Sequence, residues 1–144
     1  MSVETADETG DLNLETIRSR LQVALSEVPG IVAAYLFGSV ATGRSHAGSD
    51  VDVAILRDQA PRGTLDDLML DLESDLSHRL RATVQLVVLN RAPPELVHRV
   101  LRDGVLLIDR DPGRRIRFEV RARNEYFDVL PLLLRYRGLE QAVR

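Results

Sequence analysis

The most informative part of the sequence is Leu36-Phe37-Gly38-Ser39-Val40-Ala41-Thr42-Gly43 and, after a gap of four residues, Gly48-Ser49-Asp50-Val51-Asp52-Val53-Ala54. The apolar run 31–37, which leads into this stretch, predicts a short buried strand. Residues 40–49 hold two glycines, two serines and a threonine, so they predict a loop. From residue 50 onward acidic and apolar residues alternate, and that period predicts a second strand. The stretch therefore predicts a strand, a glycine-containing loop and an acidic strand.

Two aspartates stand at the start of the acidic strand. Residues i and i+2 of a strand face the same way, about 7 Å apart, so Asp50 and Asp52 present two carboxylates on one face while Val51 and Val53 point to the other. Neighbouring carboxylates repel each other, which raises the cost of ionising both. A divalent cation removes this cost, and hard oxygen ligands suit Mg²⁺ or Mn²⁺. The alternative for an isolated Asp-x-Asp is the solvated acidic face of an edge strand.

The residues upstream favour a metal and phosphate site over a solvated face. Gly38 lets the backbone approach a phosphate closely, and the Ser39 hydroxyl with the amides that follow can donate to phosphate oxygens. Arg44 and Ser49 are further candidate phosphate contacts in the loop, and His46 is a candidate phosphate contact or acid. For the loop residues the alternative is plain solvent exposure. Together these residues predict a site for a nucleoside triphosphate and its metal ion.

Composition excludes several other classes of protein. The chain has 144 residues, the size of one domain, and its net charge of −3 argues against direct binding of nucleic acid through overall basicity. The absence of cysteine excludes disulfides, zinc thiolates and thiol nucleophiles, and the absence of lysine excludes a Walker-type P-loop. The chain has no apolar run of about 18 residues and no signal-peptide pattern, so no membrane span is expected and the expected compartment is the cytoplasm.

Hydrophobic periodicity outlines the remaining elements. The predicted helices are 14–28, 65–80, 93–102 and 114–143, and the predicted strands are 31–37, 51–55, 82–89 and 105–108. Thr64 is the expected N-cap of the second helix, Gly104 is the expected C-cap of the third, and Pro131 is expected to kink or divide the last. This order of elements predicts an α+β fold, with one small mixed sheet and helices packed on it.

The quoted stretch resembles the signature of the polymerase-β-like nucleotidyltransferases, and in particular that of the minimal nucleotidyltransferases. The later segments Val87-Val88-Leu89-Asn90 and Asp103-Gly104-Val105-Leu106-Leu107 follow the same family's course, so the resemblance covers about residues 12–130. It implies a polymerase-β-like nucleotidyltransferase fold and Mg²⁺-dependent transfer of a nucleoside monophosphate to an acceptor hydroxyl. The family expectation for the triphosphate is ATP. By the same resemblance, Asp50 and Asp52 are the catalytic metal ligands, and Gly38 and Ser39 hold the phosphates.

One position departs from the family's pattern. Such enzymes carry a third carboxylate on a neighbouring strand, and the matching position here is Gln85. Glutamine can offer a carbonyl oxygen to a metal but cannot act as a base at neutral pH. The departure leaves three alternatives open: a partner-supplied or substrate-assisted base, slow transfer, or a fold that binds nucleotide and a partner with little chemistry.

The chain divides into three expected parts. Residues 1–11 are polar and acidic and are expected to be a flexible N-terminus, 12–130 form the minimal nucleotidyltransferase domain, and 131–144 form a C-terminal helical extension. Beyond Pro131 the leucine-rich, arginine-containing run exceeds what one covered helix face needs. An exposed apolar patch with arginines at its rim predicts contact with a protein partner.

The short chain suggests how an acceptor would be supplied. About 30 residues follow the core, too few for a substrate-binding domain, so the acceptor is expected on another molecule. Stand-alone proteins of this kind resemble the antitoxins paired with HEPN-domain RNase toxins, which implies transfer of AMP from ATP to a tyrosine hydroxyl of a cognate toxin. The alternatives are a non-catalytic antitoxin that neutralises its toxin by binding, and a nucleotidyltransferase that acts on a small molecule.

Overall fold

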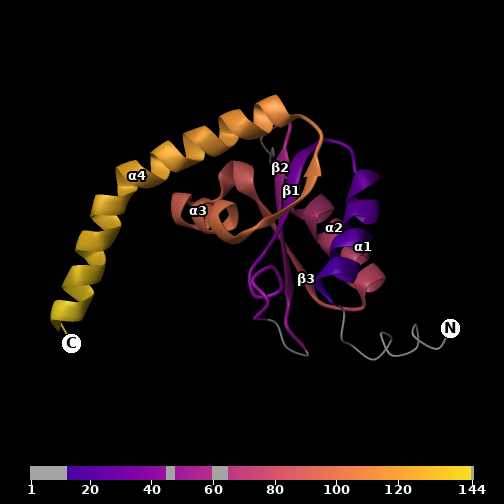
Figure 1. The fold of residues 1–144 in the computed structure, drawn as a ribbon, viewed down its shortest axis with the longest axis horizontal. Coiled ribbons are helices and arrows are strands. Elements are labelled where there is room, and N and C mark those ends of the chain that lie inside the picture. The colour runs from indigo at the N-terminus through magenta and orange to yellow at the C-terminus, as the bar shows by residue number, and fades with distance from the viewer. Residues whose placement is uncertain (1–12, 45–47, 60–64, 144) are drawn as a thin grey trace.

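The computed structural model describes residues 13–44, 48–59 and 65–143 of the chain (Figure 1). The predicted flexible segment 1–11, the loop residue His46 and the predicted N-cap Thr64 lie outside these ranges. Among the described residues, no helix is long and apolar enough to cross a membrane.

Four strands form one mixed sheet. They are β1 (Ile31–Phe37), β2 (Val51–Arg57), β3 (Val84–Val88) and β4 (Val105–Asp109), in the spatial order β3-β2-β1-β4. β1 pairs antiparallel with β2 and β4, while β2 and β3 run parallel. The two strands of the quoted stretch, β1 and β2, are therefore the two central strands of the sheet. This arrangement confirms the predicted mixed sheet of an α+β fold.

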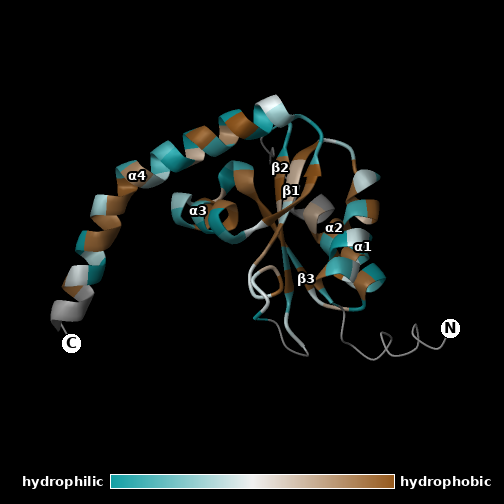
Figure 2. Ribbon diagram, viewed as in Figure 1, coloured by the Kyte–Doolittle hydropathy of each residue, from teal (hydrophilic) through white to brown (hydrophobic). Residues whose placement is uncertain are grey.

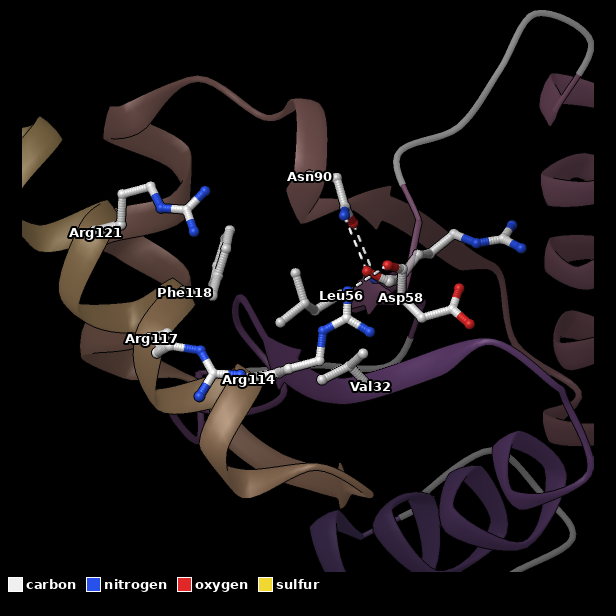
Figure 3. Close-up of a pocket in the computed structure, with 9 residues that line it drawn as sticks. Val32, Leu56, Asp58, Asn90, Arg114, Arg117, Phe118 and Arg121 are labelled. Carbon is white, nitrogen blue, oxygen red and sulfur yellow. Dashed lines mark hydrogen bonds between the residues drawn. The ribbon is translucent and has the colours of Figure 1, made fainter.

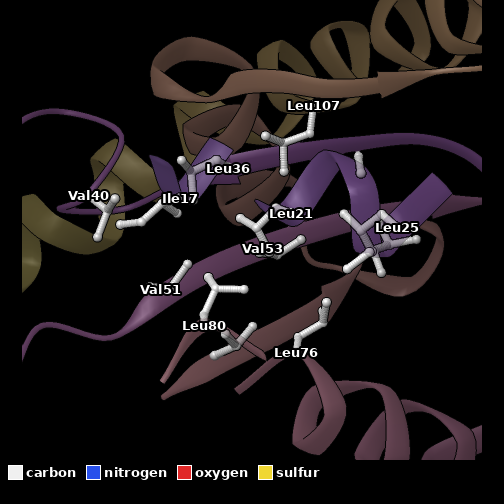
Figure 4. Close-up of a cluster of buried hydrophobic side chains, with 14 of the residues drawn as sticks. Ile17, Leu21, Leu25, Leu36, Val40, Val51, Val53, Leu76, Leu80 and Leu107 are labelled. Atoms are coloured by element: carbon white, nitrogen blue, oxygen red, sulfur yellow. The ribbon is translucent and has the colours of Figure 1, made fainter. Parts of the chain in front are cut away.

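Two layers of helices cover the two faces of the sheet. α1 (Leu14–Ser26) and α2 (Leu65–Leu80) lie on one face, and α3 (Pro94–Asp103) and the start of α4 (Pro112–Val143) lie on the other (Figure 1). Each layer encloses its own cluster of buried side chains. The cluster under α1 and α2 is drawn in Figure 4.

The strand alternation decides which layer faces the acidic side chains. Val51, Val53 and Ile55 are buried in the cluster under α1 and α2. Ala54 and Leu56 are buried in the cluster under α3 and α4. Asp52 shares the parity of Ala54 and Leu56, so it lies on the α3 face of the sheet. Burial of the three β2 residues on the opposite face is as predicted.

Several boundaries differ from the sequence-based expectation by one or two residues, and β3 and α4 are the informative cases. β3 is shorter than predicted, because the chain turns after Val88 into a short 3₁₀ helix, Leu89–Arg91. α4 is one helix that contains Pro131, so the proline does not divide it, and Figure 1 shows the helix bending partway along its length. A proline removes one backbone hydrogen bond, and a long exposed helix can absorb that loss by bending.

A polar network joins α4 to the sheet. The hydroxyl of Tyr35, on β1, donates to Glu119 Oε1 over 2.7 Å. Arg115 places Nη1 3.0 Å from Glu119 Oε1 and Nε 3.0 Å from Asp109 Oδ1, at the end of β4. Burial, and secondly the hydrogen bond to Glu119, raise the pKa of Tyr35 above its usual range. The network therefore holds the first turns of α4 to both β1 and β4.

Candidate functional site

The two predicted acidic residues stand where three strands meet. Asp50 directly precedes β2, and Asp52 is the second residue of the strand. Asp52 is opposite Phe37 on β1 and opposite Gln85 on β3. Asp50 is exposed and Asp52 is half-buried, so the pair forms the edge of a surface that solvent and a ligand can reach.

The environment of Asp52 disfavours its negative charge. Partial burial is the main cause that raises the pKa of this carboxyl, and the charge of Asp50 raises it further. The charge of Arg99, on α3, opposes both effects. A cation bound between the two carboxylates would remove their mutual repulsion and offset the free-energy cost of burying the Asp52 charge. The carboxylate oxygens suit a hard divalent ion such as Mg²⁺.

The glycine of the Gly-Ser pair lies directly against the Asp52 carboxylate. Gly38 has a φ of +78°, in the left-handed region. A Cβ atom at this position would lie 2.2 Å from Asp52 Oδ2, well inside van der Waals contact. The fold therefore brings the two halves of the motif, which are fourteen residues apart, into contact, and only glycine fits between them.

The residues after Gly38 form a compact turn. Thr42 N donates to Gly38 O over 3.2 Å, and Arg44 N donates to Ser39 O over 2.8 Å. The turn is tightened by the Thr42 hydroxyl, which lies 3.2 Å from Gly38 O and 3.3 Å from Ser39 O. Within the part of the chain that the structure describes, the Ser39 hydroxyl has no hydrogen-bond partner, so this donor is available to a ligand beside the two carboxylates.

Gln85 belongs to the same cluster. Its Nε2 donates to Asp50 Oδ2 over 2.9 Å, and its backbone stands opposite Asp52 in the parallel pair of strands. The side chain thus occupies the place from which a third carboxylate would reach the other two. Among the described residues, no three acidic or histidine side chains gather in a group that could hold a metal ion. The described part of the site therefore offers a cation two carboxylates, with an amide that supports one of them.

Two of the loop candidates, Arg44 and Ser49, are among the described residues. Arg44 is exposed, and its charge contributes to lowering the pKa of Asp103, whose main partner is Arg102. Arg44 therefore lies toward the C-terminal end of α3. Ser49 is half-buried and directly precedes Asp50. The structure thus places Ser49 next to Asp50 in the chain and Arg44 toward Asp103, and the predicted contact of both residues with phosphate stays a prediction.

Sequence reasoning missed one residue of this region, Arg99. It lies on the exposed side of α3, and its charge acts on Asp52 across the gap between helix and sheet. No motif marks it. Its position follows from Val97 and Val100, which are buried against the sheet and so orient the helix. The amphipathic pattern of α3 was the available signal, but the pattern does not say which element the polar side faces.

Comparison with known proteins places these residues in a family context. A family described as Polymerase beta, Nucleotidyltransferase matches residues 19–113. The protein adenylyltransferase MntA of Shewanella oneidensis is 32% identical over 85 residues. That match covers 58% of this chain and 58% of the relative, so it spans less than two thirds of either protein.

Solved structures share the fold over most of the chain. A toxin-antitoxin structure with AMP-PNP superposes with a TM-score of 0.72 at 23% identity, over 88% of this chain and 98% of that one. A Shewanella oneidensis structure of a tri-AMPylated HEPN toxin in complex with its MNT antitoxin matches with a TM-score of 0.69 at 20% identity, over 91% and 99% of the two chains. At these identities the similarity establishes the polymerase-β-like nucleotidyltransferase fold.

Proposed function

This chain belongs to the polymerase-β nucleotidyltransferase family, and from that premise we propose that it is an antitoxin that transfers AMP from ATP to a tyrosine hydroxyl of a HEPN-domain RNase toxin. The observation that carries the proposal is the contact between Gly38 and the Asp52 carboxylate, beside Asp50 and the Ser39 hydroxyl. The similarity to an adenylyltransferase and to toxin-antitoxin structures supports the choice of reaction and partner.

Each residue of the cluster has a role in this reaction. Gly38 and Ser39 orient the β- and γ-phosphates, with Arg44 and Ser49 as further phosphate contacts. Asp50 and Asp52 would hold Mg²⁺ or Mn²⁺, which supplies positive charge to the phosphate oxygens when bound. Arg99 adds a fixed positive charge on the α3 side of Asp52. In-line attack by the acceptor oxygen forms a bond to the α-phosphorus and breaks the α–β bridge, and pyrophosphate leaves.

The proton of the acceptor hydroxyl needs a base that Gln85 does not supply. An amide is neutral at pH 7 and does not take up a proton. Gln85 instead donates to Asp50 and so keeps that carboxylate in place. The proposal therefore assigns the base to the partner protein or to the substrate phosphates.

The partner would be bound by the second half of α4, which we call the α4 docking surface. Its large apolar side chains are between 57% and 64% exposed: Phe127, Leu132, Leu134, Tyr136 and Leu139. Figure 2 shows hydrophobic stretches along this part of the helix, which projects away from the sheet. Arg135 and Arg137 lie among them and are also exposed. Such a patch with arginines at its rim is typical of protein interfaces.

The experiment that tests the proposal combines the protein, its toxin, ATP and Mg²⁺ and measures the mass of the intact toxin. Each transferred AMP adds about 329 Da, and digestion with tandem mass spectrometry locates the modified side chain. An unchanged toxin mass, in a reaction where the complex forms, contradicts the catalytic role.

Gln85 favours one second candidate, an antitoxin that acts by binding alone. The double variant Asp50→Ala, Asp52→Ala separates the two functions, because it removes both carboxylates and leaves the α4 docking surface intact. Loss of protection against the toxin in cells supports catalysis. Retained protection supports neutralisation by binding. In both cases the protein is expected to work in the cytoplasm, together with its toxin.

A further inference from the structure

A second concave site lies at the end of the sheet away from the carboxylates. It is a pocket of about 170 Å³ between the C-terminal end of β2 and the first turns of α4 (Figure 3). Its apolar floor is made by Val32, Leu56 and Phe118. Asp52 and Arg57, at the pocket, are five positions apart on β2, about 17 Å along the strand, so this pocket is distinct from the carboxylate site.

One wall of the pocket is a row of arginines on α4. Arg114, Arg117 and Arg121 are spaced by three and four residues, so they share one face of the helix with Phe118. Figure 3 shows the three side chains around the pocket, with the Phe118 ring among them. Arg114 Nη2 donates to the backbone oxygen of Asp58 over 2.6 Å, which fixes the side of the pocket nearest β2.

The other two arginines have no acidic partner. In the described ranges, neither Arg117 nor Arg121 forms an ion pair, although Arg115, between them and Arg114 on the same helix, forms two. Arg114 is bonded to the segment after β2, but Arg117 and Arg121 are not used to attach α4, since Arg115 holds the helix to the sheet from another face. Two guanidinium groups without an ion-pair partner, side by side at a pocket, form a cationic site that can bind an anion.

The remaining polar residues of the pocket do not neutralise this row. Asn90 is engaged with the backbone of Arg57, accepting from its N–H over 2.9 Å and donating to its carbonyl over 3.0 Å. The Asp58 carboxylate is directed toward Gly30, since its Oδ1 lies 3.4 Å from where a Cβ of that glycine would be. The Arg57 guanidinium lies on the same side, 3.6 Å from that point. The α4 arginines thus dominate the charge inside the pocket.

We infer that this pocket binds the phosphate group of a small phosphorylated ligand, with Arg117 and Arg121 on the phosphate and Phe118 beneath the group that carries it. The pocket volume of about 170 Å³ accommodates a phosphate group and the atoms next to it, but not a whole drug-sized molecule, whose sites occupy about 300–1,000 Å³, so the rest of the ligand would lie outside the pocket. Charge selects phosphate over carboxylate, because a phosphate monoester carries about −1.5 to −2 at pH 7 and offers three acceptor oxygens to the planar forks of arginine. A nucleoside monophosphate and pyrophosphate both have this chemistry.

The test is calorimetric titration of the full chain with AMP and, separately, with inorganic pyrophosphate, in buffer with EDTA so that no divalent ion fills the carboxylate site. The variant Arg117→Gln, Arg121→Gln removes both charges, and it is expected to fold because neither side chain has a partner to lose. Its dissociation constant is expected to rise about tenfold or more. Arg123→Gln is the matched control, since Arg123 is exposed on the same helix two residues away and faces elsewhere. It should change binding less than about twofold.

Further measurements distinguish a small phosphorylated ligand from a nucleic-acid strand and show whether the pocket binds phosphate at all. A single-stranded RNA oligomer that binds more tightly than AMP, and loses affinity in the double variant only, assigns the phosphate to a nucleic-acid strand. Absence of binding by the wild-type protein to all three probes overturns the inference. Equal weakening by Arg123→Gln and by the double variant also overturns it, because attraction would then come from overall charge and not from the pocket. Transfer of AMP to the toxin is a separate measurement, so either proposal can fail alone.

Discussion

Gly38 meets two requirements at one residue, a left-handed backbone and a close approach to the Asp52 carboxylate. Gly43, in the same turn, has a similar φ of +74°, but no atom of the described residues lies within 4 Å of where its Cβ would be. Substitution of Gly43 therefore tests backbone strain alone, while substitution of Gly38 tests strain together with the clash against Asp52. An alanine in the left-handed region costs about 1–2 kcal/mol by itself.

Gly38→Ala is expected to reduce AMP transfer strongly, because its Cβ must displace the Asp52 side chain, while Gly43→Ala should leave transfer close to wild type. Both should lower the melting temperature, Gly38→Ala by more. Initial rates from toxin mass and thermal unfolding of each variant measure the two effects. Equal loss of activity in both variants would show that strain in the turn, and not contact with Asp52, is what matters.

Asp52 also predicts how stability depends on pH in metal-free buffer. Its pKa is raised in the folded protein, first by burial and then by Asp50, so folding favours the protonated form. The unfolded state then binds fewer protons than the folded state, and stability falls as pH rises from the unfolded value of about 3.9 through the higher folded pKa. Above that window the penalty is constant.

Asp52→Asn is accordingly expected to have a higher melting temperature than wild type at pH 7 in EDTA, with the difference closing below the unfolded pKa. Added Mg²⁺ should stabilise the wild type and not the variant, because a ligand that binds only the folded state raises its stability. Asp128→Asn, on the exposed surface of α4, controls for the change in net charge. A wild-type protein that gains stability between pH 4 and pH 7 in EDTA relative to Asp52→Asn would contradict the assigned environment.

A single substitution at Gln85 tests whether a third carboxylate at this position would increase the rate of AMP transfer. Gln85→Glu keeps the length of the side chain that already reaches Asp50 over 2.9 Å. It should speed AMP transfer at saturating Mg²⁺ and lower stability in EDTA, because three carboxylates then share one site without a counterion. Gln85→Ala serves as the comparison that removes the contact without adding charge. A Gln85→Glu protein that is slower than wild type would indicate that the amide itself is needed.

At the scale of elements, α4 performs two different tasks along one helix. Its first turns are attached to the sheet by the ion pairs of Arg115 with Glu119 and Asp109, and by the bond from Tyr35 to Glu119. Farther along, Phe118 and Ala122 pack on the buried cluster under α3. Side-chain exposure at the network is low, 18% for Arg115 and 14% for Glu119, so water does not readily replace a lost partner.

Arg115→Gln should therefore lower the free energy of unfolding by about 1–3 kcal/mol, because Glu119 keeps only the Tyr35 hydroxyl and Asp109 loses its cation. Chemical denaturation with an unchanged m-value would measure this directly. Arg123→Gln, exposed on the same helix, is expected to change stability by less than about 0.5 kcal/mol. A similar small effect for Arg115→Gln would mean that packing alone holds α4.

Elements also show where sequence reasoning reached its limit. β1, α2 and the start of β4 agree with expectation, because each is a long apolar run or a strong helical stripe. The end of β3 was not predictable, and the choice between a kinked and a divided helix at Pro131 was left open, since both depend on how neighbouring elements support the backbone. The same limit applies to Arg99, whose place beside Asp52 is set by the packing of α3.

At the scale of the whole molecule, the second half of α4 extends beyond the compact part of the chain (Figure 1). Its one polar link to the rest of the fold, among described residues, is the ion pair from Arg137 to Glu95 on α3. Nearer the start of α4, the ring of Tyr126 stacks on the ring of His98 with centroids 3.7 Å apart, and this contact joins α3 to the middle of α4. The apolar side chains of the α4 docking surface are exposed and can contact a partner.

A chain that ends at Leu130 is expected to fold as the full chain does but not to bind the toxin. The free energy of unfolding should change by less than about 1 kcal/mol, because an exposed ion pair is the main contact removed. Binding to the toxin, measured by calorimetry or co-purification, should be lost. Leu134→Glu, Leu139→Glu in the full chain tests the same surface without shortening the helix. Undiminished binding by both variants would place the interface elsewhere.

The order of elements, the mixed sheet and the family could be read from the sequence alone, as could the four candidate site residues, Gly38, Ser39, Asp50 and Asp52. These follow from local periodicity and from a motif whose spacing is carried by two adjacent strands. Tertiary structure alone decided that Gly38 lies against Asp52, that Gln85 donates to Asp50, and that the charge of Arg99 acts on Asp52. It also decided that three arginines of α4 line a pocket at the other end of the sheet. The reason is that contacts between distant segments depend on strand register and helix rotation, and a single chain pattern specifies which residues are buried but not what they meet.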